Sequence, residues 1–166
     1  MTAKNIINIL YETHDDIKEK IIVMKDALKI LDTDTLRTRK DDIISFFNTH
    51  LNVHFKKEEI LIATTYKYHT ITPKEQQILA EIISEHVQLL NKYKKFIVLS
   101  DQVDKRHSQH NDDFILVFYD ILDTLLKHAE KEDTLVYPIL QKYLDATQLK
   151  EALQCITSAP AIDHSV

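Results

Sequence analysis

The chain has 166 residues, a length that suits one domain with a full-sized core, and its formal net charge is −5. It contains no glycine and only one cysteine, and no stretch is strongly basic. These features argue against phosphate-binding loops, intrachain disulfides, cysteine-ligated zinc, iron–sulfur clusters and nucleic-acid binding. The apolar runs are too short for a membrane span and no signal peptide is evident, so we predict a cytoplasmic protein.

The spacing of apolar residues predicts an all-α protein with four long helices. We expect the first at about 3–31, the second at about 36–68 and the third at about 74–99, with Thr72 as N-cap and Pro73 at its first position. The fourth is expected at about 112–143, where Pro138 kinks or ends it, and a short C-terminal helix could follow near 148–156.

Short polar connections between these helices favour an up-down-up-down four-helix bundle. We expect residues 1–157 to form this single domain and residues 158–166 to be a flexible tail. Each helix carries an apolar stripe with members three or four residues apart, as expected for a face that packs on a core. The first stripe ends with Leu28 and Leu31, the second includes Ile44, and the fourth includes Leu135.

Six positions on these stripes are polar, and every helix contributes at least one of them. They are His14, His54, Glu58, His86, His128 and Glu132. An unpaired charge that faces a core costs several kcal/mol, so a polar residue in each stripe is hard to explain as an accident of register. Residues 50–59, HLNVHFKKEE, would alone suit a solvated helix surface. Counted from the helix ends, however, the four histidines lie at mid-height of an antiparallel bundle and converge.

This set of four imidazoles and two carboxylates, without thiolate, suits Fe, Mn, Zn or Cu better than Ca or Mg. The unit His-x-x-x-Glu occurs twice, which suggests two ions, because a carboxylate has two oxygens and can bridge. With a bridging oxide or hydroxide, six-coordinate ions would keep about one open position each, where O2, peroxide or NO could bind. A buried hydrogen-bonded network of the same residues without metal is the alternative.

The chain resembles the hemerythrin-like family in the segments ILYETHDDI, HFKKEE, SEH and HAEKEDTLVYP, over about residues 6–140. The Glu-x-x-His signature of ferritin-like bundles does not occur on the stripes. The resemblance implies a four-helix bundle with two non-haem iron ions bridged by two carboxylates and an oxo or hydroxo group. It implies terminal ligands at His14, His54, His86 and His128, and bridging ligands at Glu58 and Glu132.

Two features qualify the resemblance. Oxygen-carrying hemerythrins use a His-x-x-x-x-Asp spacing, which makes Asp133 a rival to Glu132, but Glu132 lies on the stripe and we favour it. Those carriers also place two histidines four residues apart on the third helix, where this chain has His86 and Leu90. The set is therefore more similar to the bacterial and repair-of-iron-centres type. Because the chain begins with its bundle and lacks their N-terminal cysteine-containing domain, full repair activity is not implied.

The leading functional hypothesis is a di-iron protein that binds or reduces NO, O2 or peroxide, with an electron donor or an iron-cluster protein as a further partner. Whether it is an enzyme stays open. The alternatives are an iron or oxygen sensor or an iron-handling protein without turnover, and a metal-free phosphotransfer bundle, for which His50 is the candidate.

Several residues beside the stripes have two interpretations. His50 lies on the surface or joins the site, and Tyr11 and Tyr93 are core tyrosines that could approach the metals. Cys155 is expected to pack the last helix.

Overall fold

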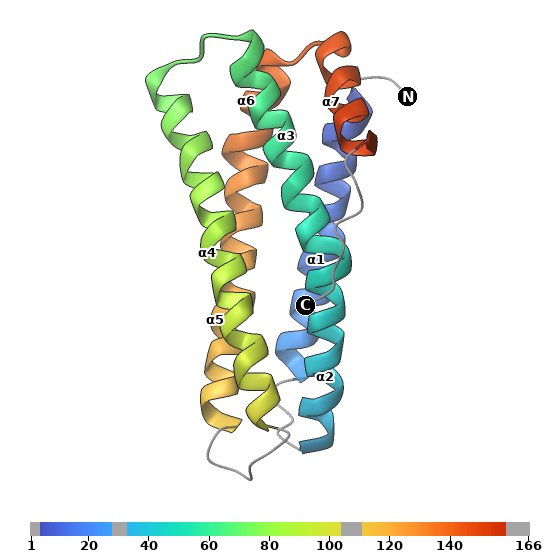
Figure 1. Cartoon of the computed structure of the whole chain (residues 1–166), viewed down its shortest axis with the longest axis vertical. Coiled ribbons are helices and arrows are strands. Elements are labelled where there is room, and N and C mark those ends of the chain that lie inside the picture. The colour runs from blue at the N-terminus through green and yellow to red at the C-terminus, as the bar shows by residue number, and fades with distance from the viewer. Residues whose placement is uncertain (1–3, 28–32, 104–110, 159–166) are drawn as a thin grey trace.

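The computed structural model describes residues 4–27, 33–103 and 111–158. These residues form four long helical rods that run alternately up and down, followed by a short helix (Figure 1). Two of the rods contain a π-helical turn: η1 lies near the middle of the second rod, and η2 lies toward the C-terminal end of the fourth. The elements are α1 (Lys4–Ala27), α2 (Thr33–Phe46), η1 (Phe47–Leu51), α3 (Asn52–Tyr68), α4 (Pro73–Val103), α5 (Asn111–Lys131), η2 (Glu132–Val136), α6 (Tyr137–Tyr143) and α7 (Ala146–Ser158).

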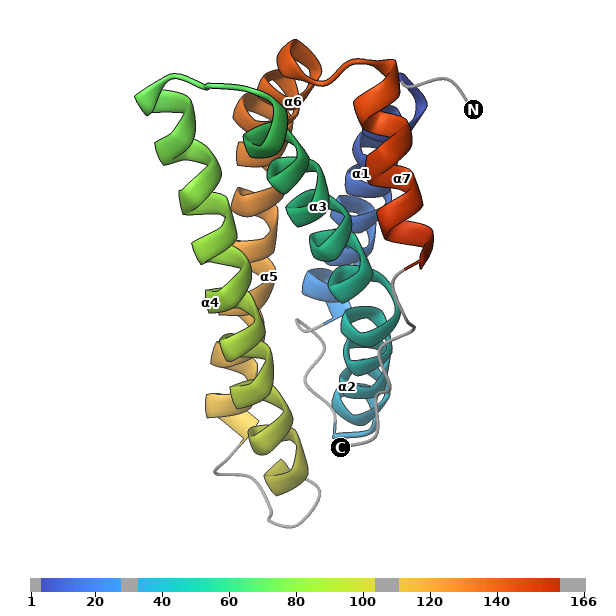
Figure 2. The same cartoon turned by 45° about the horizontal axis from the view of Figure 1, so that its top comes forward.

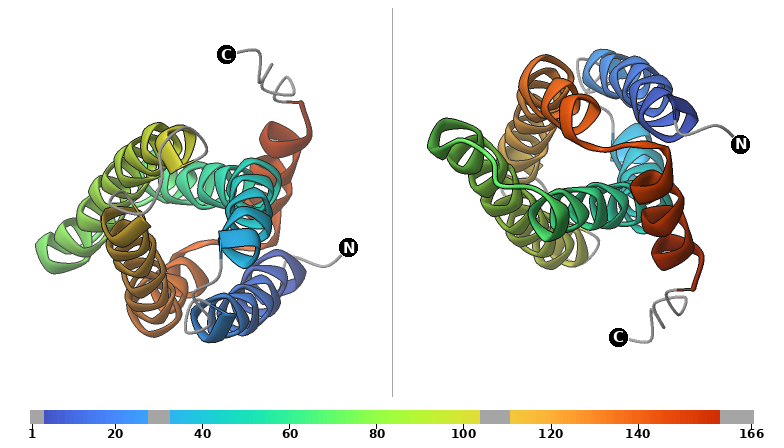
Figure 3. Two further views of the ribbon diagram at one scale, coloured as in Figure 1. Left: turned by 90° about the horizontal axis from the view of Figure 1, so that it is seen from below. Right: turned by 90° about the horizontal axis from the view of Figure 1, so that it is seen from above.

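Viewed along the bundle axis, the four rods form a ring and α7 lies outside it (Figure 3). Helix α4 packs against α3 and α5, and α5 in turn packs against α1. Helix α7 covers α1 and α3 near the end of the bundle where α6 finishes (Figure 2). This arrangement confirms the predicted helical bundle with a short C-terminal helix. No helix in the described ranges is long and apolar enough to cross a membrane.

The core is divided into two apolar clusters, one toward each end of the bundle. One cluster is built around Phe47, Phe96 and Phe118, and the other around Leu61, Ile82 and Leu140. The six polar stripe residues are buried as well, and they occupy the level between the two clusters. The prediction that they lie at mid-height is therefore confirmed.

Pro138 does not end the fourth rod, because the preceding π turn changes the hydrogen-bond register. Tyr137 donates its N–H to the carbonyl of Glu132, five residues earlier. In that register the donor for the Asp133 carbonyl would be residue 138, and proline has no N–H. The Tyr11 hydroxyl donates to this carbonyl instead, at 3.2 Å. The helix therefore continues through Pro138 as α6.

One predicted core position, Leu135 within η2, is wrong, and a second, Ile44 just before η1, packs against the core but is only partly buried. Leu135 is 42 % exposed whereas Val136 is fully buried, and Ile44 is only partly buried whereas Ile43 is fully buried. A π turn closes its hydrogen bond over one more residue than an α turn, so a fixed spacing of three and four fails across it. The stripe positions 28 and 31 and the predicted tail lie outside the described residues or at their edge.

The predicted start of α4 is confirmed by a reciprocal cap. The Glu75 N–H donates to the Thr72 hydroxyl at 3.3 Å, and the Thr72 N–H donates to the Glu75 carboxylate at 3.1 Å. We expect Thr72→Ala to lower the free energy of unfolding by about 1 kcal/mol, because the orphan N–H of Glu75 loses its acceptor. Urea denaturation beside Thr70→Ala, an exposed threonine of the same connection, checks this. Equal midpoints for the two variants would contradict it.

Candidate metal centre

The four rods bring all six predicted site residues together in one buried layer. His14 comes from α1, His54 and Glu58 from α3, His86 from α4, His128 from α5, and Glu132 is the first residue of η2. Their exposed fractions are between 0 and 3 %. Buried ionisable groups at this density require pairing or coordination, since each uncompensated charge costs several kcal/mol.

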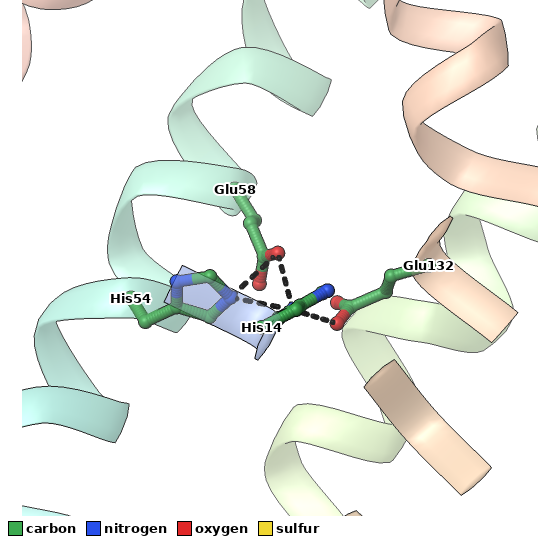
Figure 4. Close-up of side chains that lie close together, drawn as sticks. All are labelled: His14, His54, Glu58 and Glu132. Carbon is green, nitrogen blue, oxygen red and sulfur yellow. Dashed lines mark hydrogen bonds and ion pairs between the residues drawn. The ribbon is translucent and has the colours of Figure 1, made fainter. Parts of the chain in front are cut away.

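One group of ligand atoms forms around His14 and His54, whose Nε2 atoms are 2.8 Å apart. The Glu58 Oε1 atom lies 3.0 Å from His54 Nε2, and the Glu132 Oε2 atom lies 3.2 Å from His14 Nε2. Figure 4 shows these four side chains pointing toward one another from three rods. These residues could hold one metal ion.

The second group forms around His86 and His128. The Glu132 Oε1 atom lies 3.2 Å from His86 Nε2 and 3.1 Å from His128 Nε2. The Glu58 Oε2 atom lies 3.5 Å from His86 Nε2. Each carboxylate therefore turns one oxygen toward each histidine pair, which is the arrangement needed for two ions with two carboxylate bridges. Among the described residues Glu132 belongs to both groups.

The chemistry of these atoms fits a bound cation pair. Within the described part of the chain, Glu58 Oε2, His128 Nε2 and Glu132 Oε2 are buried without a hydrogen-bond partner. An unsatisfied buried polar atom costs about 1–3 kcal/mol, and more when it is charged. All three belong to the two candidate ligand groups, so coordination would satisfy them together. Nitrogen and oxygen donors without thiolate suit Fe, Mn, Zn or Cu better than Ca or Mg.

Three of the histidines are oriented by carboxylates on their outer side. The Nδ1 atoms of His14, His86 and His128 lie 2.7, 3.0 and 2.8 Å from carboxylate oxygens of Asp133, Glu59 and Glu85, respectively. With the proton on Nδ1, each ring donates outward and turns the lone pair of Nε2 toward the centre of the bundle. Such partners fix the ring orientation and raise the basicity of a metal ligand.

In the metal-free protein the two inner carboxylates attract protons onto the imidazoles. Burial lowers the pKa of His86, but hydrogen bonds with Glu132, Glu58 and Glu59 outweigh burial and raise this pKa to about 11. Burial opposes ionisation of Glu132, yet its close contacts with His128, His14 and His86 hold its pKa well below the usual value. Metal ions compete with these protons for the same nitrogen atoms.

The rival residues lie away from the two ligand groups. Asp133 contacts the outer nitrogen of His14 and pairs with Lys18, and its side chain is 17 % exposed. His50 is exposed, lies 2.6 Å from the Thr49 hydroxyl, and its ring stacks on Phe46.

The other sequence candidates lie elsewhere too. Tyr93 donates a hydrogen bond to Asn48, and the hydroxyl of Tyr11 is directed to the Asp133 carbonyl. Cys155 is exposed on α7, so the expectation that it packs that helix is wrong.

Sequence reasoning missed Tyr137, which is fully buried and reaches the site from α6. Its hydroxyl donates to Glu58 Oε1 and lies 3.0 Å from His14 Nε2 and 3.5 Å from His54 Nε2. Burial, followed by the charges of Glu58 and Glu132, raises the pKa of this phenol far above its usual value. Tyr137 is five residues after Glu132, so a regular α-helix would not place it on the inward-facing stripe. The π turn η2 brings it back onto that face. Pro138 was the available signal for that irregularity.

We expect Asp133→Asn to weaken metal binding about 10- to 100-fold without unfolding the bundle. The amide can still accept the hydrogen bond that orients His14, but it lacks the negative charge that makes His14 a more basic ligand. Titration of the metal-free variant with Fe2+ measures this, and Asp123→Asn, an exposed aspartate of α5, is the matched control. An affinity equal to that of the control would show that Asp133 does not act on the site.

The fold and the site define a metal-binding helical bundle with a potential di-metal centre. The family model described as "Hemerythrin HHE cation binding domain" matches residues 5–140, and the chain belongs to this family. The resemblance recognised in the sequence is thereby confirmed. Comparisons with curated proteins and with solved structures each gave no match.

Proposed function

We propose that this chain is a non-haem di-iron protein that binds or reduces a small oxidant, NO, O2 or peroxide. The observation that carries the proposal is the overlap of the two ligand groups at Glu132, whose two oxygens face different histidine pairs. His14 and His54 would hold one iron, and His86 and His128 the other. Glu58 and Glu132 would bridge them, with an oxo or hydroxo group as the third bridge. When bound, the iron pair would supply redox and Lewis-acid chemistry at this site.

A small cavity beside the ligand atoms supports a ligand of one or two heavy atoms. Its volume is about 10 Å³, which is room for roughly one water molecule. Apolar side chains from three rods form most of its wall, and ligand residues form the rest. The lining residues are His14, Ile17, Leu51, His54, Phe55, Leu125, His128, Ala129 and Glu132. A site of this size and lining favours a very small ligand over larger substrates.

The protein residues around the centre hold its ligands and its protons in place. Phe55 stacks on the His86 ring with centroids 4.2 Å apart and an interplanar angle of 13°. On the outer side Glu85 pairs with His128 and with Lys131, whose Nζ lies 2.7 Å from the carboxylate. Phe55 and an outer carboxylate thus hold the His86 and His128 rings, and Lys131 balances the charge of Glu85.

The proposal is tested by loading the purified chain with iron, reducing it without oxygen and mixing it with NO, O2 or peroxide. We expect spectral changes at the metal centre with at least one of the three. Ala129→Leu, which fills the cavity, should keep the iron but bind the ligand about tenfold or more weakly, since overpacking costs about 1–3 kcal/mol. Ala63→Leu, on the exposed side of α3, is the control. A loaded centre inert to all three oxidants would refute the proposal.

A sensor or iron-handling role is the second candidate, and the unsatisfied buried atoms favour it. Because Glu58 Oε2, His128 Nε2 and Glu132 Oε2 have no hydrogen-bond partner among the described residues, metal loading would change the stability of the bundle. A partner that binds the loaded and the metal-free forms with different affinity would support this role. A partner that donates electrons to the metal centre would instead support the binding or reduction of an oxidant. The cytoplasmic location stays a prediction.

A further inference from the structure

The hydroxyl of Tyr137 lies inside the ligand group of His14 and His54 rather than behind it. Its oxygen is 3.0 Å from His14 Nε2 and 3.5 Å from His54 Nε2, and it donates to Glu58 Oε1. Ligands bound at right angles about 2.1 Å from one ion are about 3 Å apart. The distances from the phenol oxygen to the two imidazole nitrogens are therefore close to those expected between ligands of the same ion.

Without metal, a proton on the imidazole can hold the phenol at this position, and in the loaded protein a cation can take the place of that proton. A phenol has one O–H, and it is directed to Glu58 Oε1. With the proton of His14 on Nδ1, facing Asp133 at 2.7 Å, the Nε2 lone pair is turned toward the phenol oxygen. Two lone pairs 3.0 Å apart repel each other unless a proton or a cation lies between them. The same argument holds for the pair His14 Nε2 and His54 Nε2, at 2.8 Å.

The sequence around Tyr137 positions this oxygen. The π turn η2 inserts the additional residue that rotates Tyr137 onto the inner face of the rod. Tyr11 packs edge-on against the Tyr137 ring, with centroids 4.8 Å apart and an interplanar angle of 84°. The Tyr11 hydroxyl also satisfies the carbonyl of Asp133, which Pro138 leaves without a donor. The irregular turn is thus stabilised by contacts to α1, and the phenol is held toward the site.

We propose that Tyr137 is a further protein ligand of the ion held by His14 and His54, and that the ion held by His86 and His128 is the one that binds the small oxidant. On coordination the O–H bond breaks, an oxygen–metal bond forms, and the proton leaves to solvent with the others that metal binding releases. This inference rests on the proposed di-iron centre.

The two positions then differ in the number of protein ligands. The first has two imidazoles, two carboxylate oxygens and the phenol oxygen, and a bridging oxygen would complete about six bonds. The second has two imidazoles and two carboxylate oxygens, so the same bridge leaves about one bond open. The sequence predicted one open position on each ion. With Tyr137 as a ligand, only the ion at His86 and His128 keeps an open position.

The test uses the iron(III)-loaded full chain, visible absorption and resonance Raman spectra excited in the visible band. We expect the vibrational modes of an iron-bound phenolate in the wild type. We expect the same modes in Tyr93→Phe, because this variant removes a hydroxyl that donates a hydrogen bond to Asn48 and not to the ligand group. In Tyr137→Phe these modes should disappear while iron stays bound. In the reduced proteins, NO bound per chain should rise from about one to about two in Tyr137→Phe, because the lost ligand opens a position.

Several results would overturn the inference. Loaded wild-type protein without phenolate modes refutes it even if Tyr137→Phe fails to fold, and modes that persist in Tyr137→Phe refute it as well. If that variant does not fold, ring-deuterated tyrosine in the wild type and in Tyr11→Phe identifies the modes and excludes Tyr11 as their source. Two bound irons that react with NO but show no phenolate modes would refute this inference and leave the proposed function intact. A chain that binds no iron would refute both.

Discussion

Glu132→Ala is expected to abolish the binding of both metal ions at once. The two oxygens of Glu132 face different histidine pairs, at 3.2 Å from His14 Nε2 and 3.1 Å from His128 Nε2. Removal of the side chain therefore takes one ligand from each position and opens the bridge between them. We expect iron per chain, measured by elemental analysis after gel filtration, to fall from about two to nearly zero, a loss in affinity above about 100-fold.

Two matched variants show whether this loss is specific. Glu130→Ala removes an exposed glutamate from the same rod and should retain both ions. His54→Ala removes a ligand from the first group only, so about one ion per chain should remain at His86 and His128. Circular dichroism must show a folded bundle in each case. Full metal content in Glu132→Ala would be incompatible with a shared bridging carboxylate.

The second large effect is the response of metal-free and iron-loaded protein to pH. The pKa of His86 is raised from 6.5 to about 11 in the metal-free fold. A raised histidine pKa stabilises the fold fully below about pH 6.5, and this contribution is lost as the pH rises toward about 11. The pKa of Glu132 is lowered, so its contribution is present above its ordinary value of 4.5 and is lost in acid. Metal-free protein should therefore be most stable in the mildly acidic range.

Iron-loaded protein should behave in the opposite way above neutral pH. Metal binding requires unprotonated imidazoles, so affinity increases as the pH rises. At a free iron concentration of 100 times Kd the metal adds about 2.7 kcal/mol, which raises the melting temperature by about 5–10 °C for a chain of this size.

Differential scanning fluorimetry of both forms between about pH 6.5 and 9 measures the divergence of the two melting temperatures. A constant difference across this range would contradict the role assigned to the inner carboxylates and His86.

Much of this architecture follows from local patterns. The spacing of Leu10, Ile17 and Ile21 on the first rod, and of Phe114, Phe118 and Ile121 on the fourth, predicts helices with one apolar face, and those residues are buried. The polar residues that interrupt the same faces are also buried at one level. Periodicity was sufficient because an α-helix places every third or fourth side chain on the same side, whatever its neighbours are.

The features that the spacing of apolar residues did not predict lie at the π turn η2. Val136 replaces Leu135 in the core, and Tyr137 enters the site, because η2 departs from the α-helical register. That turn is stabilised by a hydrogen bond from Tyr11, which is 122 positions away in the chain. A spacing rule applied within one rod contains no information about such a bond.

Residue order alone was enough to indicate an all-helical bundle, its family and the six inward-facing imidazoles and carboxylates, since each depends on spacing within a single helix. The assembled bundle was needed to show which oxygen of Glu58 and Glu132 faces which histidine pair, that Asp133 lies behind His14, and that a phenol joins them. Those features depend on distances between atoms of different rods, and such distances exist only after the rods have packed together.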